Sequence, residues 1–163
     1  TGGRRGGAPR GEMAMDIVGE HRIAAPRDLV WRALFDVETL KRCIPGCKEV
    51  EQTSPTSFAA RVQLKIGPVS ATFSGTVELV DIEAPAGCRI VGQGDGGIAG
   101  FAKGSSQVTL AEDGDGTLLR YDAKAEIGGK LAALGSRLVV ATSRKLADQF
   151  FQAFVKALDE AQV

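Results

Sequence analysis

Two cysteines in the segment KRCIPGCKEV, residues 41–50, are the first residues whose type and spacing could support chemistry. Cys43 and Cys47 flank a Pro-Gly pair and could form a metal site, a redox pair or a nucleophile. A structural zinc site needs four ligands, and only His21 and Cys88 remain as further His or Cys ligands. The spacing C-x-x-x-C differs from the C-x-x-C of redox proteins, and no base is adjacent to activate a thiol. The pattern therefore favours small buried thiols in a tight loop, and we expect no metal site.

His21 and Tyr121 are the polar side chains best placed to contact a ligand. His21 has the same strand parity as Ile17 and Ile23, so its side chain is expected to point inward. It could be a hydrogen-bonded core histidine or a donor to a ligand carbonyl, and both roles remain open. Tyr121 could likewise pack in the core or present its phenol to a cavity. Because the chain has neither a Ser-His-Asp set nor a convincing carboxylate pair, we expect no catalytic residue and no enzymatic activity.

Length and charge limit what these residues can do. The 163 residues fit one domain, which we expect to span residues 15–161. Residues 1–14 are rich in Gly and Arg and lack apolar periodicity, so we expect a disordered leader or a cloning remnant. The 20 basic residues are balanced by 20 acidic ones, which leaves no excess of basic charge for binding nucleic acid.

Cysteine usage and hydropathy indicate a compartment. Three cysteines without a secretory hydrophobic segment argue for free thiols in a reducing environment. No run approaches the roughly 18 consecutive apolar residues of a membrane span. We therefore expect a cytoplasmic protein.

The hydrophobic periodicity changes along the chain in a way that predicts an α+β fold. Strand-like alternation at residues 15–23 is followed by two short helices, with Pro26 at the start of the first and Asp36 capping the second. Alternation of apolar and polar residues then continues from 58 to 127, and after Gly129 the spacing becomes helical for roughly 30 residues. We predict a curved seven-stranded antiparallel sheet wrapped around a long C-terminal helix, with two short helices between strands 1 and 2.

The side chains predicted to face the long helix are small. They include Ala60, Ala71, Gly75, Gly100 or Gly104, Ala123 and Ala125. Two interpretations remain open: the glycines allow the sheet to curve and the helix sinks deeper, or the unfilled space is an apolar cavity of ligand size. Because a large empty void destabilises a fold, the second interpretation implies a bound apolar molecule.

Several motifs together resemble one protein family. These are DVETLKRCIPGCKEVEQ (36–52), KIGPVSATFSGTVEL (65–79), GFAKGSSQVTL (100–110), GGKLAALGSRLV (128–139) and FFQAFVKAL (150–158). They resemble the CoxG family, named for the G subunit of carbon monoxide dehydrogenase, within the SRPBCC, or START-like, helix-grip superfamily. The resemblance runs from about Met15 to Leu158, and the C-x-P-G element followed by K-x-G-P is its most specific part.

The resemblance implies a function as well as a fold. It implies an apolar cavity between sheet and helix without a catalytic centre, holding a menaquinone-like or ubiquinone-like lipid. The partner it implies is a molybdenum hydroxylase of the carbon monoxide dehydrogenase type, to which the lipid is delivered. It also implies transient contact with the inner face of the cell membrane. Two alternatives remain: an assembly or maturation factor for that enzyme, or a helix-grip enzyme that acts on an apolar substrate.

The residues expected to line this cavity come from the strands, the long helix and the CIPGC turn. They are Leu40, Ile44, Pro45, Val62, Leu64, Phe73, Val77, Phe101, Tyr121, Ala123, Leu134 and Leu138, with His21 as a polar contact. Because Pro45 and Gly46 turn the chain sharply, we expect Leu40 and Ile44 at the rim and the thiols buried beside it. The turn is thus predicted to be a gate.

Overall fold

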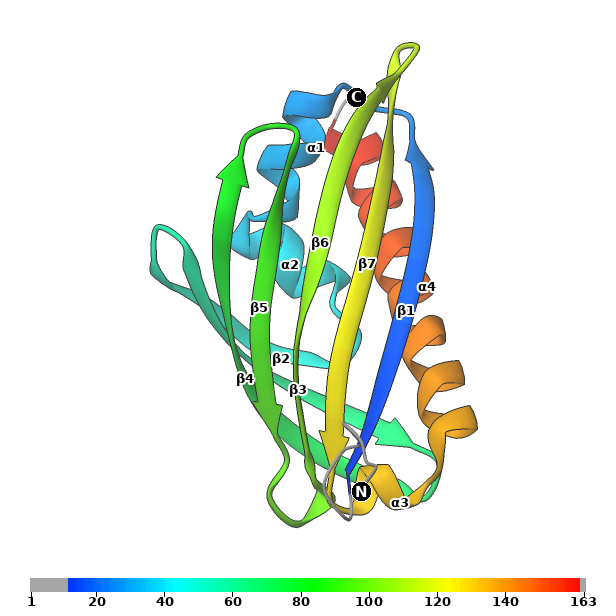
Figure 1. The fold of residues 1–163 in the computed structure, drawn as a ribbon. Coiled ribbons are helices and arrows are strands. Elements are labelled where there is room, and N and C mark those ends of the chain that lie inside the picture. The colour runs from blue at the N-terminus through cyan, green and yellow to red at the C-terminus, as the bar shows by residue number, and fades with distance from the viewer. Residues whose placement is uncertain (1–11, 162–163) are drawn as a thin grey trace.

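A single seven-stranded antiparallel sheet forms the body of the protein, whose computed structural model describes residues 12–161 (Figure 1). The strands are β1 (Glu12–Ile23), β2 (Cys47–Ser54), β3 (Ser57–Ile66), β4 (Val69–Glu83), β5 (Gly87–Asp95), β6 (Phe101–Asp113) and β7 (Gly116–Gly128). Antiparallel pairing joins β2 through β7 in sequence, and β1 pairs with β7, which gives the order β1-β7-β6-β5-β4-β3-β2. The predicted sheet is confirmed.

Four helices accompany the sheet in the part of the chain that the structure describes. They are α1 (Arg27–Leu34), α2 (Val37–Cys43), α3 (Lys130–Ala133) and α4 (Ser136–Ala161), and a 3-10 turn, η1 (Gly97–Ala99), lies between β5 and β6. Figure 1 shows α4 running along the sheet, with α1 and α2 beside its C-terminal half. Two short helices between the first two strands and a long C-terminal helix are therefore as predicted.

Strand β1 begins earlier than the sequence suggested. Glu12, Met13 and Ala14 pair with Gly128, Ile127 and Glu126 of β7, although residues 1–14 were expected to be a leader. These three residues belong to the sheet because each has a partner on β7, while residues 1–11 lie outside the described residues. The folded unit thus includes residues 12–14.

The predicted continuous C-terminal helix is divided in two. Gly135 adopts a positive φ of 92°, a left-handed conformation that ends helices, so α3 stops and α4 starts afresh at Ser136. Leu131 therefore lies on α3 and Leu134 in the connection, outside the long helix. Within residues 12–161, no helix is both long enough and apolar enough to span a membrane.

Two packed clusters close the two ends of the space between sheet and helix. At one end, Phe154 of α4 is fully buried against α1 and the strands, in a cluster that contains Val30 and Leu119. At the other end, Leu131 and Val139 pack on the sheet in a second cluster. Helix α2 is positioned by Asp36, whose carboxylate accepts hydrogen bonds from the Thr39 backbone N–H at 3.0 Å and from its hydroxyl at 2.9 Å.

Candidate functional site

A cavity of about 490 Å³ lies between these clusters, bordered by the inner face of the sheet, by α1 and α2, and by α4. Its surface is almost wholly apolar. Its lining residues are Leu34, Phe35, Leu40, Ile44, Val50, Phe58, Ala60, Val62, Phe73, Gly75, Thr76, Val77, Leu79, Ile90, Gln93, Gly94, Ser106, Val108, Leu119, Tyr121, Ala147, Phe150 and Phe151. The hollow predicted from the small inward side chains is therefore present.

Two glycines explain why side chains do not fill the space between the middle of the sheet and α4. Gly75 on β4 and Gly94 on β5 pair directly, and Ala60 on β3 pairs with Gly75. A Cβ placed on Gly94 would have the Ser74 carbonyl oxygen, 3.9 Å away, as its nearest neighbour. Open space therefore lies where this side chain would be, so the helix has not sunk into the gap.

Aromatic rings form the wall of the cavity towards α4. Phe150 and Phe151 lie edge to face with ring centroids 5.0 Å apart, and Phe151 stacks on Tyr121 at 5.8 Å. The ring of His21 also stacks on Phe151, at 4.2 Å, but His21 does not line the cavity itself. The half-buried histidine thus supports an aromatic wall, and the expected contact with a ligand stays a prediction.

Tyr121 is the one titratable side chain among the described residues that line the cavity. Burial raises the pKa of its phenol, the carboxylate of Asp148 raises it further, and Arg144 acts in the opposite direction. The phenol is therefore neutral at physiological pH and can donate a hydrogen bond. Ser106, on the neighbouring strand, adds a second hydroxyl to the lining.

The CIPGC turn lies at the edge of the cavity. Leu40 and Ile44 line the cavity, as expected for a rim, and the turn is fixed because Gln63 of β3 donates its backbone N–H to the Gly46 carbonyl at 2.8 Å. Gly46 has a φ of 72°, and a Cβ there would lie on the Gln63 carbonyl oxygen. Only glycine is compatible with this close approach.

The three thiols lie apart from any arrangement that would suggest chemistry. Cys43 and Cys88 are buried in different clusters, and Cys47 is half-buried. Burial is the largest influence on each and raises the pKa of all three thiols, so they are protonated at neutral pH. Within residues 12–161, no three His, Cys, Asp or Glu side chains gather as metal ligands.

Six of the residues predicted for the site line this cavity together. They are Leu40, Ile44, Val62, Phe73, Val77 and Tyr121. Ala123 faces an adjoining apolar pocket of about 330 Å³, which shares Ile90, Gly94 and Ser106 with the cavity. These residues form one continuous inner surface.

The other five predicted lining residues lie elsewhere; they are Pro45, Leu64, Phe101, Leu134 and Leu138. Leu64 packs against the cluster around Phe73 and Val139 and also borders a separate recess beside the CIPGC turn, and Pro45 is half-buried outside the lining. Leu134 packs in the cluster near α3, and Leu138 is 36% exposed and covers Gly67, because Gly135 interrupts the helix on which both were placed.

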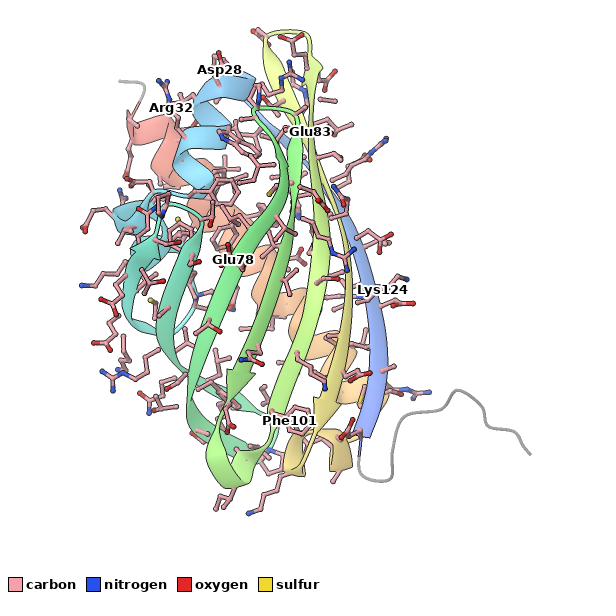
Figure 2. The ribbon with its side chains drawn as sticks, turned by 60° about the vertical axis from the view of Figure 1, so that its left-hand side comes forward. Asp28, Arg32, Glu78, Glu83, Phe101 and Lys124 are labelled. Atoms are coloured by element: carbon pink, nitrogen blue, oxygen red, sulfur yellow. The ribbon has the colours of Figure 1, made fainter. Side chains whose placement is uncertain are left out.

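Phe101 is placed on the wrong face by the sequence prediction. The β6–β7 register runs without a shift, so Phe101 has the opposite parity to Ser106 and Val108, which line the cavity. Its ring lies over Gly128 on the outer face of the sheet, where Lys124 is also seen (Figure 2). Phe101 therefore covers a glycine on the outside of the sheet and does not contact the cavity.

Several large lining residues were missed by the sequence prediction of the site. Phe58 and Leu79 had the inward parity of their strands, and Phe150 belonged to the apolar stripe of the C-terminal helix. Strand alternation could have identified the first two. Phe151 and Ala147 lie beside that stripe, and only the packing of α4 identifies them as lining residues.

Solved structures with the same fold cover nearly the whole chain. A conserved protein from Geobacillus kaustophilus is 28% identical, with a TM-score of 0.85, 90% of this chain covered and 97% of that one. A START superfamily protein from Mycobacterium smegmatis is 16% identical (TM-score 0.69; 90% and 98% covered). The Zhui aromatase/cyclase from Streptomyces sp. R1128 is also 16% identical (TM-score 0.67; 92% and 96% covered).

Sequence comparison assigns the family. No curated protein matches the chain. The model of the CoxG family, the G subunit of carbon monoxide dehydrogenase, matches residues 19–159, which include all the residues that line the cavity. The chain, with its START-like fold, therefore belongs to the CoxG family.

Proposed function

We propose that the protein is a non-enzymatic carrier that holds a quinone-type lipid in the cavity and delivers it to a molybdenum hydroxylase of the carbon monoxide dehydrogenase type. The observation that carries the proposal is the cavity itself: about 490 Å³, almost wholly apolar, with Tyr121 as its one titratable side chain within the described residues. Its volume lies in the range of about 300–1,000 Å³ that is typical of sites for small molecules.

The lining matches the chemistry of a quinone. Stacked and edge-on rings, at Tyr121, Phe150 and Phe151, suit a flat conjugated head group. The hydroxyl of Tyr121 lies over Gly19 of β1, and this neutral phenol would donate a hydrogen bond to a quinone carbonyl that reaches that side of the cavity. Aliphatic side chains make up most of the remaining wall and suit an isoprenoid tail, whose burial contributes about 25 cal/mol per Å².

An enzymatic function on an apolar substrate is less well supported. The aromatase/cyclase has the same fold at 16% identity, and this similarity concerns the fold alone. Acid–base chemistry needs convergent titratable groups, and among the described residues that line the cavity Tyr121 has no titratable neighbour. A binding role requires no such pair.

The proposed partner rests on the family. The CoxG name connects the family to carbon monoxide dehydrogenase, and delivery of an electron-accepting lipid is one role that would explain both the connection and the cavity. An assembly factor that acts through its surface would explain the connection alone. The two roles differ in whether the cavity is occupied.

The first experiment extracts the protein, purified from quinone-containing cells, with organic solvent and identifies the lipid by mass spectrometry. We expect about one quinone per protein when the site is saturated, because the proposal places the lipid in the one apolar cavity that the described residues form between the sheet and α4. Protein that contains no lipid and binds no added quinone would contradict the carrier role and favour the assembly factor.

Variants at the rim connect the lipid to this cavity. Ile44→Asp places a charge on the lining and should lower lipid content strongly, because a carboxylate beside apolar walls loses its hydration. Val18→Asp makes the same change at a side chain that is 58% exposed and should leave the lipid content unchanged. Cys43→Ser should also be nearly silent. Equal loss in the variants at residues 44 and 18 would refute the assignment.

His21 tests which polar group orients the head group. His21→Phe keeps the stacking on Phe151 but removes both ring nitrogens. Because His21 lies behind the aromatic wall, we expect quinone affinity to be unchanged in this variant and to fall in Tyr121→Phe. The opposite ranking, measured by fluorescence titration with a short-chain quinone, would assign the hydrogen bond to His21.

A further inference from the structure

A second recess, of about 530 Å³, lies beside the CIPGC turn and outside the apolar cavity. It is lined by Lys41, Arg42, Ile44, Gly46, Cys47, Lys48, Gln63, Leu64, Lys65 and Ser70. Ile44 lines both the recess and the cavity, so the two spaces meet at this side chain. The recess thus lies at the rim where we expect a lipid to enter.

The charge of the recess is of one sign. Four of its lining residues are basic, and no described lining residue is a carboxylate. Arg42 is engaged by Glu160 of α4 at 2.6 Å. Over residues 12–161, no carboxylate lies within salt-bridge distance of Lys41, Lys48 or Lys65, all of which are exposed.

Lysines on the outer face of the sheet behave differently. Lys103 pairs with Glu126 and Lys124 pairs with Asp16, each at 3.5 Å. Their charges are therefore compensated within the protein. The recess, in contrast, presents three uncompensated ammonium groups around one concave surface, although the chain as a whole has no net charge.

The recess is preformed by three elements that are fixed to one another. Lys41 lies in the last turn of α2, Lys48 at the start of β2 and Lys65 on β3. The hydrogen bond between Gln63 and Gly46 joins the turn to β3 and holds these segments together. A small anion would therefore meet ammonium groups that need little backbone rearrangement.

We propose that this cationic recess binds the phosphate group of an anionic membrane phospholipid, and so docks the rim of the cavity on an anionic lipid surface. The three ammonium groups supply the attraction, because each lysine near such a surface contributes favourably to binding. Ile44, which lines both the recess and the cavity, offers an apolar contact to the first carbons of the lipid. Docking by this surface places the rim of the cavity against the membrane, where an apolar lipid can pass without crossing water.

The test measures binding of the full chain to vesicles by flotation. Phosphatidylcholine vesicles with phosphatidylglycerol are compared with phosphatidylcholine alone, at low and at physiological salt. The test variant is Lys41→Gln/Lys48→Gln/Lys65→Gln. The control, Lys103→Gln/Lys124→Gln/Lys130→Gln, makes the same change in net charge elsewhere on the surface.

We expect binding to the anionic vesicles that weakens with salt and is absent with phosphatidylcholine alone. The recess variant should lose about fivefold in partition coefficient per lysine, which corresponds to about 1 kcal/mol each and to roughly a hundredfold in all. The control variant should keep binding close to that of the unmodified protein. Equal loss in both triple variants, or no binding to anionic vesicles at low salt, would overturn the proposal.

Inorganic phosphate separates a lipid phosphate from a free one. Because the recess is proposed to bind a phosphate group, inorganic phosphate should reduce vesicle binding more than chloride does at equal ionic strength, and the recess variant should lose this difference. Binding of inorganic phosphate to the recess without any binding to anionic vesicles at low salt would show a site for the free ion and overturn docking on lipid.

The docking proposal rests on the proposed function for its biological role. Its test does not depend on that function. Lipid extracted from the recess variant should match that of the unmodified protein when both are loaded with quinone in detergent. Protein that contains quinone but fails to bind vesicles would refute docking alone. Protein that binds vesicles through the recess but never contains lipid would refute the carrier role alone.

Discussion

The substitution Gly94→Leu tests whether the space between sheet and helix is a ligand site. Gly94 lies on the inner face of β5 and lines the cavity, and a Cβ there comes no closer than 3.9 Å to the carbonyl oxygen of Ser74, its nearest neighbour. A leucine side chain can therefore enter the cavity without a backbone shift. It would occupy volume that the ligand needs.

The expected effects on stability and on binding have opposite signs. Burial of a leucine side chain contributes about 1.5–3 kcal/mol, and replacement of a glycine at a compatible position adds about 0.4–1 kcal/mol. We expect the empty protein to gain about 2 kcal/mol in unfolding free energy, or about 4–8 °C in Tm for a chain of this length. Quinone affinity should fall about tenfold or more, because about 1.4 kcal/mol of lost contact already has this effect.

The control is the neighbouring residue on the same strand. Gln93 borders the cavity with its backbone, but it is exposed and its side chain points to the outer face. Gln93→Leu therefore adds the same side chain outside the cavity. Thermal unfolding of delipidated protein and fluorescence titration with quinone are measured for both variants. A Gly94→Leu protein that is destabilised, or that binds quinone as before, would show that the cavity is not the open ligand site we describe.

Three further predictions concern the segment around α2 and the thiols. Asp36→Ala removes the cap of α2 and should cost about 1 kcal/mol, or about 2–4 °C in Tm, as measured by calorimetry. Arg42 holds the pKa of the Glu160 carboxylate below its usual range. The ion pair therefore stabilises the contact between α2 and α4 at a pH above the usual pKa of a glutamate, and this effect is lost as the pH falls through the lowered pKa. Hydrogen exchange of the α2 amides should then increase. Iodoacetamide should modify half-buried Cys47 before buried Cys43 and Cys88, as followed by mass spectrometry; the reverse order would contradict the burial.

The fold and half of the site follow from periodicity. Alternation along β3, β4 and β7 placed Val62, Phe73 and Tyr121 on the inner face, because side chains of a strand change face at every residue. The helix-then-turn pattern of residues 36–47 placed Leu40 and Ile44 at the rim. In both cases the local pattern and the global packing agree, and local patterns then suffice.

The errors fall where glycine removes the signal. Phe101 follows a glycine-rich turn, so its parity cannot be assigned from the sequence, and its pairing with Gly128 on β7 places it outside. Leu134 and Leu138 were assigned to one uninterrupted helix, but the positive φ of Gly135 rotates the segments relative to each other. Neither outcome depends on hydrophobicity, which is the property that periodicity measures.

The cationic recess was not predicted, and the reason is topological. Lys41, Lys48 and Lys65 are exposed residues on three different elements, and each one alone is an ordinary surface lysine. Only the turn at Gly46 and its hydrogen bond to β3 bring them around one concavity. A function that depends on the sum of separate surface charges is therefore visible only in the folded protein.

The contacts around the rim indicate which part of it opens. The Gly46 turn is tied to β3 by a backbone hydrogen bond, and its glycine has no room for any other residue, so the turn itself is rigid. Helix α2 is held to α4 by Cys43, which is buried in the same cluster as Phe154, and by the pair of Arg42 and Glu160, whose side chains are both more than half exposed. Water screens the exposed ion pair, so most of this attachment comes from the buried contact. A ligand that enters past Ile44 would therefore have to loosen the packing of Cys43 against α4 and move Lys41 with α2, while Lys48 and Lys65 keep their places on the strands.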